Sequence, residues 1–356
     1  MSFARVRGQQ RAVGQLQAAI RAGRLAHAYL FTGPAGVGKR TLARELGKAV
    51  LCEQQRADGC DRCRDCRAVE GGTSPDFGAL TVEDAAGRLR PVEDSDREIK
   101  IASIRELTRA LSLTSTSGRT RVFLVPGAER MNEEAANALL KTLEEPAGSR
   151  LLMLTTARPE ALLPTVLSRV ARIRLRSLSA GEVAEYLVAE RKLPGEDARE
   201  LAGASGGSIG AALAASLESV RAARNFAAER LARARLGAPL DLSDAMMDFA
   251  RAAAAAAGRD KGLEPVRREL LGLWKQALGL YRAALAAALG ASAGPEGGSL
   301  AALGAERLLR ALSALLRADR AVREYAPPEL VCRVLAGELS ALAPSASILQ
   351  RKARDA

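Results

Sequence analysis

A glycine-rich loop close to the amino terminus constrains the fold of this chain more than any other feature. The apolar run Ala28-Tyr29-Leu30-Phe31 is typical of a buried strand, and it leads into the loop Gly33-Pro34-Ala35-Gly36-Val37-Gly38-Lys39. A helical pattern then starts at Lys39 and continues to about Val50. Glycines between a strand and a helix let backbone N–H groups converge on a phosphate, and the start of the helix adds positive potential. The sequence therefore predicts a phosphate loop in which Lys39 reaches the terminal phosphates, with an ordinary glycine turn as the alternative.

The wider pattern predicts an α/β fold followed by helices. Apolar runs lie at residues 121–125, 151–156 and 173–175, and helical patterns lie at residues 9–22, 101–113 and 133–145. Strands separated by helices imply a mostly parallel sheet with helices on both of its faces. After about residue 178 the chain has no convincing strand pattern. We therefore expect an α/β domain at residues 1–178, a small three-helix domain at residues 179–218 and an all-helical domain at residues 219–346.

The nucleotide-binding segment that ends at Thr41 lacks the groups that hold magnesium. The residue after the loop lysine is Arg40, where a Ser or Thr hydroxyl would ligate the metal, and Thr41 is rotated from that position by roughly 100°. The apolar run 122–125 ends in Pro126-Gly127 instead of acids, and Glu129 lies past the end of that run. Because hydrolysis needs a metal and a group that orients water, we expect none here. Binding of ATP or ADP as a structural ligand remains open.

Four cysteines with close spacing predict a structural zinc site. Their spacing is C-x7-C-x2-C-x2-C, in a polar stretch at about residues 52–77. Since the chain has a single histidine, the cysteines must supply all four ligands of a tetrahedral ion. A redox pair or simple buried cysteines are the alternatives. The predicted ligands are Cys52, Cys60, Cys63 and Cys66, while Cys332 lies in an apolar helical setting and is expected in a core.

Charge and hydropathy limit the classes of protein to which the chain can belong. The formal net charge is +12, which suits nucleic acid because neutralised phosphates release counterions, although an arginine-rich chain from a GC-rich genome would also carry it. No apolar run reaches the length that spans a bilayer, and the first ten residues lack the apolar stretch of a signal peptide. We therefore expect a cytoplasmic protein without a membrane partner.

Several short motifs are spread along residues 1 to about 215. They are Gly8-Gln9, Leu25-Ala26-His27-Ala28-Tyr29-Leu30-Phe31, Pro75-Asp76-Phe77, Ile104-Arg105-Glu106-Leu107 and Asn137-Ala138-Leu139-Leu140-Lys141-Thr142-Leu143-Glu144-Glu145-Pro146. A further motif, Leu163-Pro164-Thr165-Val166-Leu167-Ser168-Arg169, is similar to a signature that ends in Ser-Arg-Cys, with Val170 at the cysteine position. With the cysteine module inserted after the phosphate loop, the chain resembles the bacterial clamp-loader AAA+ subunits of DNA polymerase III.

Within that family the chain resembles the delta-prime type, which loses its ATPase residues, more than the gamma/tau motors, which keep them. Arg40 and Pro126-Gly127 stand where a motor would have a hydroxyl and two acids. A motor also carries a sensor arginine in a Gly-Ser-x-Arg setting, whereas here Gly207-Ser208-Ile209 is followed by Gly210. The resemblance identifies Arg169 as an arginine finger that acts in trans on ATP bound to an adjacent gamma/tau subunit.

The resemblance implies the rest of the assembly. It makes the first domain RecA-like, the second a lid and the third a collar that holds subunits together. The implied partners are gamma/tau and delta, the sliding clamp through the complex, and primed DNA. The chain would then be a non-catalytic stator within the polymerase holoenzyme. Two alternatives are an active clamp-loader ATPase and a separate zinc-dependent nucleic-acid-binding protein.

Overall fold

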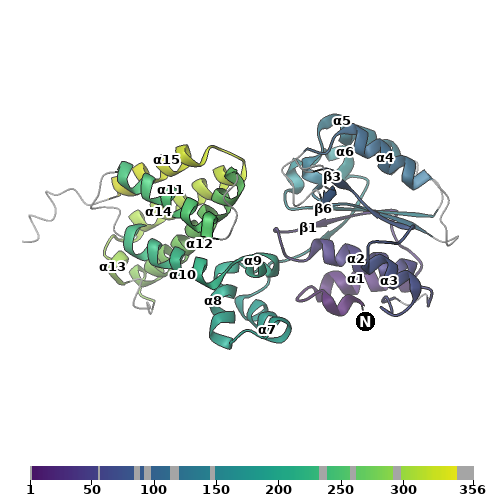
Figure 1. Cartoon of the computed structure of the whole chain (residues 1–356), viewed down its shortest axis with the longest axis horizontal. Helices are drawn as coiled ribbons and strands as arrows, with labels where there is room; N and C mark the ends of the chain where they lie inside the picture. Colours follow the sequence, from purple (N-terminus) through teal and green to yellow (C-terminus); the bar gives the residue numbers. More distant parts are fainter. Residues whose placement is uncertain are drawn as a thin grey trace, which may run out of the picture. The chain divides into compact units, whose positions relative to one another are not determined.

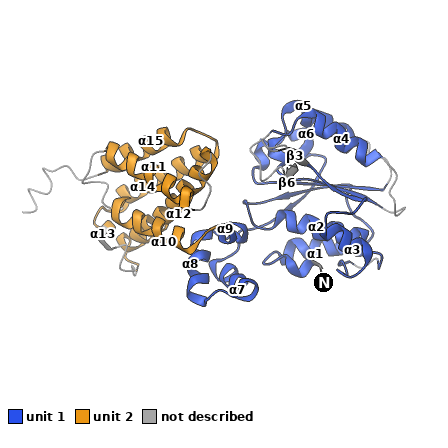
Figure 2. Ribbon diagram, viewed as in Figure 1, with its two compact units in different colours: residues 1–213 blue, residues 214–356 orange. Residues whose placement is uncertain are grey.

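The computed structural model describes residues 2–54, 57–83, 89–91, 98–112, 120–144, 149–231, 239–256, 262–291 and 298–342. The chain forms two compact units, unit 1 (Met1–Leu213) and unit 2 (Ala214–Ala356), shown separately in colour in Figure 2. Glu145 and Pro146 of the predicted helix motif and residues 343–346 of the predicted collar lie outside the described residues. The three-domain division at about residues 178 and 218 stays a prediction.

Unit 1 is built on a five-stranded sheet in the order β2-β5-β6-β1-β7, in which every neighbouring pair is parallel. The strands are β1 (Ala28–Thr32), β2 (Phe77–Ala79), β5 (Arg121–Val125), β6 (Arg150–Thr156) and β7 (Ala171–Arg174). All of β1 is buried, and Arg150 is the one residue of β6 that is not, as expected for central strands covered on both faces. The predicted α/β fold with a parallel sheet is confirmed.

Helices cover both faces of this sheet (Figure 1). One face carries α1 (Gln10–Arg21) and α2 (Lys39–Leu51), and the other carries α4 (Ile101–Ser112) and α5 (Glu133–Glu144). Side chains alternate along β1, so Tyr29 and Phe31 join the core with α2, while Ala28 and Leu30 join the core with α4 and α5. This two-sided packing fixes the end of β1, from which the glycine-rich loop starts.

Two short features of unit 1 are absent from the sequence prediction. One is the edge strand β2, and the other is an antiparallel pair formed by β3 (Thr81–Glu83) and β4 (Leu89–Pro91). Each of these strands has three residues, too few to show a periodicity. In β2 the middle residue is Gly78, where an added Cβ would lie 2.3 Å from the ring of Phe123. The packing against Phe123 therefore requires a glycine in β2, and this glycine interrupts the apolar run by which a buried strand is predicted.

The last part of unit 1 contains α7 (Ala180–Arg191), α8 (Gly195–Ser205) and α9 (Ile209–Ala214). Helix α7 begins with a capping box, in which the Ser179 hydroxyl accepts from the backbone N–H of Glu182 and the Glu182 carboxylate accepts from that of Ser179. Arg176 donates to the same carboxylate at 2.9 Å, and its backbone N–H and C=O bond the side chain of Gln9. These contacts connect the start of α7 to the segment before α1.

The pKa of Glu182 gives this contact a testable pH dependence. Arg176, followed by the N–H of Ser179, lowers the pKa of Glu182 from 4.5 to about 2. Because the folded pKa lies below the unfolded one, the stabilisation is present above about pH 4.5 and is lost as the pH falls through about 2. We expect Glu182→Gln to lower the thermal unfolding midpoint at neutral pH. The difference in midpoint between the wild type and the variant should shrink as the pH falls from about 4.5 to about 2. A gap that stays constant down to pH 2 would show that the charge of Glu182 is not the cause.

Unit 2 is helical throughout its described residues. Its helices are α10 (Leu217–Phe226), the π-helix η5 (Ala227–Leu231), α11 (Pro239–Ala256), α12 (Leu263–Ala288), α13 (Gly298–Ala301), α14 (Ala305–Arg323) and α15 (Pro328–Ala341). They enclose one apolar core, which includes the fully buried Trp274. Cys332 is also buried there, as predicted, and burial raises the pKa of its thiol to about 12.

No helix among the described residues is long and apolar enough to cross a membrane.

Candidate functional site

The predicted phosphate loop joins β1 to α2 and depends on its glycines. Gly33, Gly36 and Gly38 have φ values of 148°, 72° and 98°, a region that side chains with a Cβ rarely adopt. A Cβ would lie 2.5 Å from the Leu175 carbonyl oxygen at Gly33, and 2.2 Å from the Ser208 hydroxyl at Gly36. Gly38 precedes the first turn of α2, so the amino-terminal N–H groups of this helix face the loop.

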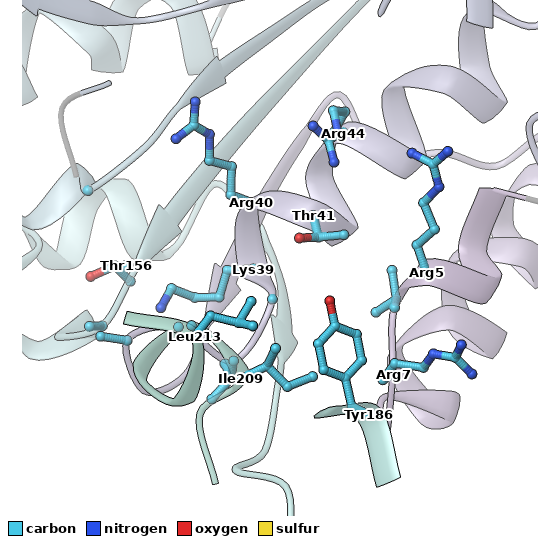
Figure 3. A pocket seen from close by; sticks show the side chains of 18 of the residues that line it. Arg5, Arg7, Lys39, Arg40, Thr41, Arg44, Thr156, Tyr186, Ile209 and Leu213 are labelled. Atoms are coloured by element: carbon cyan, nitrogen blue, oxygen red, sulfur yellow. The ribbon is translucent and has the colours of Figure 1, made fainter. Parts of the chain in front are cut away.

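Lys39 lies beneath this loop and beside a large cavity (Figure 3). Its side chain is buried, and its Nζ donates to the carbonyl oxygens of Gly33 at 2.9 Å and Pro34 at 2.8 Å. Arg40 and Thr41 also line the cavity, which has a volume of about 960 Å³, within the range of small-molecule sites. All the predicted loop residues from Ala35 to Thr41 contribute to its wall.

The other walls come from the first residues of the chain and from the helices after β7. The short helix η1 (Ser2–Arg5) continues into Val6 and Arg7, and these residues line one side. Helices α7 and α9 supply a second side, which includes Tyr186, Ile209 and Leu213 (Figure 3). The cavity therefore has an apolar part between η1 and the helices, in addition to its glycine-rich end.

Helix α9 packs directly on the phosphate loop. The backbone N–H of Gly210 donates to the carbonyl of Gly36 at 3.1 Å, and a Cβ at Gly210 would lie 3.0 Å from the Gly36 Cα. Position 210 is the one where the motor pattern has its sensor arginine. A side chain at position 210 would push α9 away from the loop. The absence of the arginine therefore permits the direct backbone contact between Gly210 and Gly36.

One carboxylate, that of Glu129, reaches the cavity from beyond the end of β5. Pro126 and Gly127 follow β5, as the sequence indicates, and the left-handed Gly127 then starts the short helix η3 (Ala128–Arg130). This turn carries Glu129 into the cavity wall, where its Oε1 accepts from the N–H of Ala157 at 3.2 Å. Its Oε2 is buried and has no hydrogen-bond partner among the described residues. No local sequence pattern predicts that Glu129 lies in the cavity wall, because its position depends on the turn that follows β5.

Arg169 does not line the cavity. It follows α6 (Pro164–Leu167), and its side chain is 37% exposed. Its Nη2 lies 2.8 Å from Glu144 Oε1 at the end of α5, and its Nη1 donates to the Thr165 carbonyl at 3.0 Å. The guanidinium is thus held on the surface of its own subunit by solvent-exposed contacts.

The four predicted metal ligands come together in one cluster. Their sulfur atoms lie within 4.8 Å of one another, and Cys60 Sγ and Cys66 Sγ are 3.9 Å apart. A tetrahedral zinc ion with Zn–S bonds of about 2.3 Å separates its sulfur ligands by about 3.8 Å, so the cluster fits such an ion. Backbone N–H groups of Arg62 and Cys63 lower the pKa of Cys60 to about 6, which favours the thiolate that binds metal. Four protein ligands leave no open position for catalysis.

A buried lysine fixes this cysteine module to the helix of the phosphate loop. Lys48 of α2 is 1% exposed and forms ion pairs with Glu45 at 3.2 Å, with Asp61 at 3.1 Å, and with Glu70. Asp61 lies between two of the cysteines, and Glu70 ends α3 (Arg64–Glu70) of the module. Arg5 of η1 pairs with Glu70 as well, at 2.7 Å. The module, η1 and α2 therefore share one group of charges.

The cysteine geometry predicts that the purified chain carries about one zinc ion. We expect Cys66→Ser to remove this ion and to lower the thermal unfolding midpoint by several degrees, because the buried ligand closes the module on α2. Metal content by inductively coupled plasma mass spectrometry, together with thermal unfolding, tests this. Cys332→Ser is the matched control and should keep the metal. A wild-type chain free of metal, or a Cys66 variant that retains it, would contradict the zinc assignment.

Comparison with known proteins shows which proteins the chain is similar to. Residues 8–179 match the family described as "DNA polymerase III, delta subunit". The delta' subunit of Pseudomonas aeruginosa DNA polymerase III is 40% identical over 187 residues, 51% of this chain and 53% of that protein. The Bacillus subtilis delta' subunit is 32% identical over 186 residues, 52% of this chain and 53% of that protein. The tau/gamma subunit of Haemophilus influenzae is 35% identical over 214 residues, 58% of this chain and 29% of that protein.

The chain spans about half the length of these delta' relatives. The family match, residues 8–179, contains the sheet, the phosphate loop and the cysteine cluster. By these matches, residues 8–179 of the chain resemble the clamp-loader subunits of DNA polymerase III, including those of the delta-prime type.

Proposed function

We propose that the chain is a non-catalytic stator of the DNA polymerase III clamp loader, and that it supplies Arg169 to the active site of an adjacent gamma/tau subunit. One contrast carries this proposal. The chain's own cavity has Arg40 where a motor has a hydroxyl and lacks a motor's strand-end acids, while Arg169 lies outside that cavity and is partly exposed. Such an arrangement serves a neighbour's nucleotide better than the chain's own.

The chain's own site is poorly equipped for hydrolysis. Arg40 cannot ligate a cation, and neither Pro126 nor Gly127 offers a carboxylate. Glu129 reaches the cavity, but one of its oxygens accepts a bond from the backbone of Ala157. A phosphoryl-transfer site needs both a metal to neutralise charge and a group to orient water. This single carboxylate is the one feature that favours the alternative of an active ATPase.

Arg169 can leave its present contacts at small cost. Its ion pair with Glu144 is exposed on both sides, at 37% and 48%, and exposed pairs contribute about 0.2–1 kcal/mol. A desolvated phosphate would be a stronger partner for the planar, permanently charged guanidinium. The pair therefore orients the arginine in the free subunit without preventing its transfer to a nucleotide.

In this proposal the partners are gamma/tau and delta, and the complex loads the sliding clamp onto primed DNA in the cytoplasm. The helical unit 2 is the part that would join the collar of the assembly. The cysteine module would hold a structural zinc ion beside α2, and a nucleotide bound in the cavity would also be structural.

Reconstitution tests the proposed function. The chain would be mixed with gamma/tau and delta, separated by size-exclusion chromatography, and assayed for transfer of labelled clamp onto primed DNA. We expect one complex that contains the chain and loads the clamp, and little loading when the chain is omitted. Failure to join the complex would reject the stator proposal, and tight DNA binding by the chain alone that depends on Cys66 would favour the nucleic-acid-binding alternative.

A further inference from the structure

The first residues of the chain contact both the cysteine module and the segment that leads into α7. They comprise η1 and the short stretch that follows it, and we call residues 2–9 the strap. Four of these residues form a single turn of 3₁₀ helix, and so short a segment has no stable conformation of its own. Contacts at its two ends therefore determine where the strap lies.

The first half of the strap is bound by the cysteine module. The backbone N–H of Phe3 donates to Asp58 Oδ1 at 2.9 Å, and Arg5 Nη1 lies 2.7 Å from Glu70 Oε1. The ring of Phe3 is buried in the apolar core that also contains Val69 of α3. Two carboxylates and one apolar side chain of the module therefore hold this half of the strap.

The second half of the strap is bound by the residues before and along α7. Gln9 is 4% exposed, and its side chain bonds the backbone C=O and N–H of Arg176 at 2.8 Å and 3.1 Å. Arg7 forms an exposed ion pair with Glu190 of α7 at 2.8 Å. Two hydrogen bonds and one ion pair therefore join the strap to α7 and to the segment that leads into it.

The cysteine module is too small to hold its carboxylates in place without a metal. It contains one seven-residue helix, and its buried side chains among the described residues are Cys52, Cys66 and Val69. So small an apolar core usually requires a metal or disulfides, and the four sulfurs lie within 4.8 Å of one another, as a zinc ion requires. Asp58 lies between Cys52 and Cys60 in the sequence, so the order of the ligands also fixes Asp58.

From these contacts we infer that the cysteine module holds the strap in place, and that the strap in turn fastens α7 to the α/β part of unit 1. Loss of the metal would release Asp58 and Glu70 from the strap, and the strap would then no longer hold α7. The inference rests on the zinc element of the proposed function and goes beyond it, because it gives the module a role in placing α7. Coupling of this kind is reciprocal, so release of the strap would also weaken metal binding.

Hydrogen–deuterium exchange of the full chain, measured by mass spectrometry, tests this inference. We expect Cys66→Ser, which removes the metal, to speed exchange about tenfold in peptides that cover the strap and the first turns of α7, the effect of losing one charge-assisted hydrogen bond. Cys332→Ser is the matched control. It changes a buried cysteine of unit 2 and should leave exchange in both peptides unchanged.

Asp58→Ala tests the strap in a chain that keeps all four cysteines. We expect the same faster exchange in the strap and in α7 while zinc stays bound, with zinc affinity lowered by about tenfold because the coupling is reciprocal. Zinc content by mass spectrometry and competition with a chromogenic chelator measure these two quantities. Glu53→Ala changes an exposed acid of the same module and is the matched control, which should behave like the wild type.

Gln9→Ala separates an effect carried by the strap from a general loss of stability. In this variant α7 should exchange faster, and the further change Cys66→Ser should speed exchange in the strap but not in α7. An effect of Cys66→Ser on α7 that is equally large with and without Gln9 would overturn the inference, as would faster exchange confined to the module. A wild-type chain free of zinc would overturn the zinc assignment as well. The stator proposal would stand in each case, because assembly and clamp loading test it separately.

Discussion

Replacement of Lys48 by methionine is expected to lower the free energy of unfolding of unit 1 by about 3–5 kcal/mol, the usual cost of breaking a buried ion pair from one side. Lys48 is 1% exposed and Glu45 is fully buried, so the variant removes the nearer of the two cations that pair with the Glu45 carboxylate, the other being Arg44 at 3.9 Å. The same change releases Asp61 and Glu70, which join the cysteine module to α2. Urea unfolding followed by far-ultraviolet circular dichroism measures the effect.

A double variant separates the buried charge from the loss of packing. Lys48→Met with Glu45→Gln removes both charges, and we expect it to recover a large part of the lost stability. The single tryptophan, Trp274, is buried in unit 2, so its fluorescence is an internal reference for the unit that lacks these residues. A loss below about 1 kcal/mol in the single variant, as for an exposed pair, would show that Lys48 is not the anchor.

Arg169→Ala is expected to reduce ATP turnover at the adjacent gamma/tau site by a factor on the order of a thousand, as for arginine fingers elsewhere. The alanine variant removes the positive charge that Arg169 would position beside the phosphates. Arg169→Lys should recover little, because an ammonium group cannot reproduce the planar fork of a guanidinium. The measurement is steady-state ATP hydrolysis by the reconstituted complex with clamp and primed DNA, with assembly checked by chromatography.

Glu144→Gln is the matched control for this effect. It breaks the 2.8 Å ion pair of Arg169 but leaves the arginine in the chain. We expect this variant to retain turnover near the wild-type rate, because the pair is exposed and weak. Equal losses in the two variants would indicate that the ion pair itself, and not contact with a neighbour's phosphate, is what the complex requires.

The parts of the fold that follow from local pattern were predictable. The buried strands β1, β5 and β6 are continuous apolar runs, and the glycine loop and the cysteine spacing each need particular residue types. The edge strand β2 was not predictable, because three residues that include Gly78 show no period. Lys48 resembles an exposed helix residue in the sequence, and its burial depends on a module that folds back from residues 52–70.

The candidate site was predictable as a loop and not as a cavity. Its walls come from η1 and α9, which are far from the loop in sequence and contribute through packing. In the sequence, position 210 shows only that a motor's arginine is replaced by glycine, whereas the contact of Gly210 with Gly36 depends on the placement of α9. Glu129 lies beyond the end of β5 in the sequence, and the turn at Gly127 brings it to the cavity.

We expect the chain to have no ATPase activity of its own and to support that of its neighbour. The most direct test measures ATP turnover, in the presence of clamp and primed DNA, by the chain alone, by gamma/tau with delta, and by the complete complex. We expect no turnover by the chain alone and a large increase when it completes the complex, an increase that Arg169→Ala abolishes. Turnover by the chain alone, or an increase that survives this substitution, would contradict it.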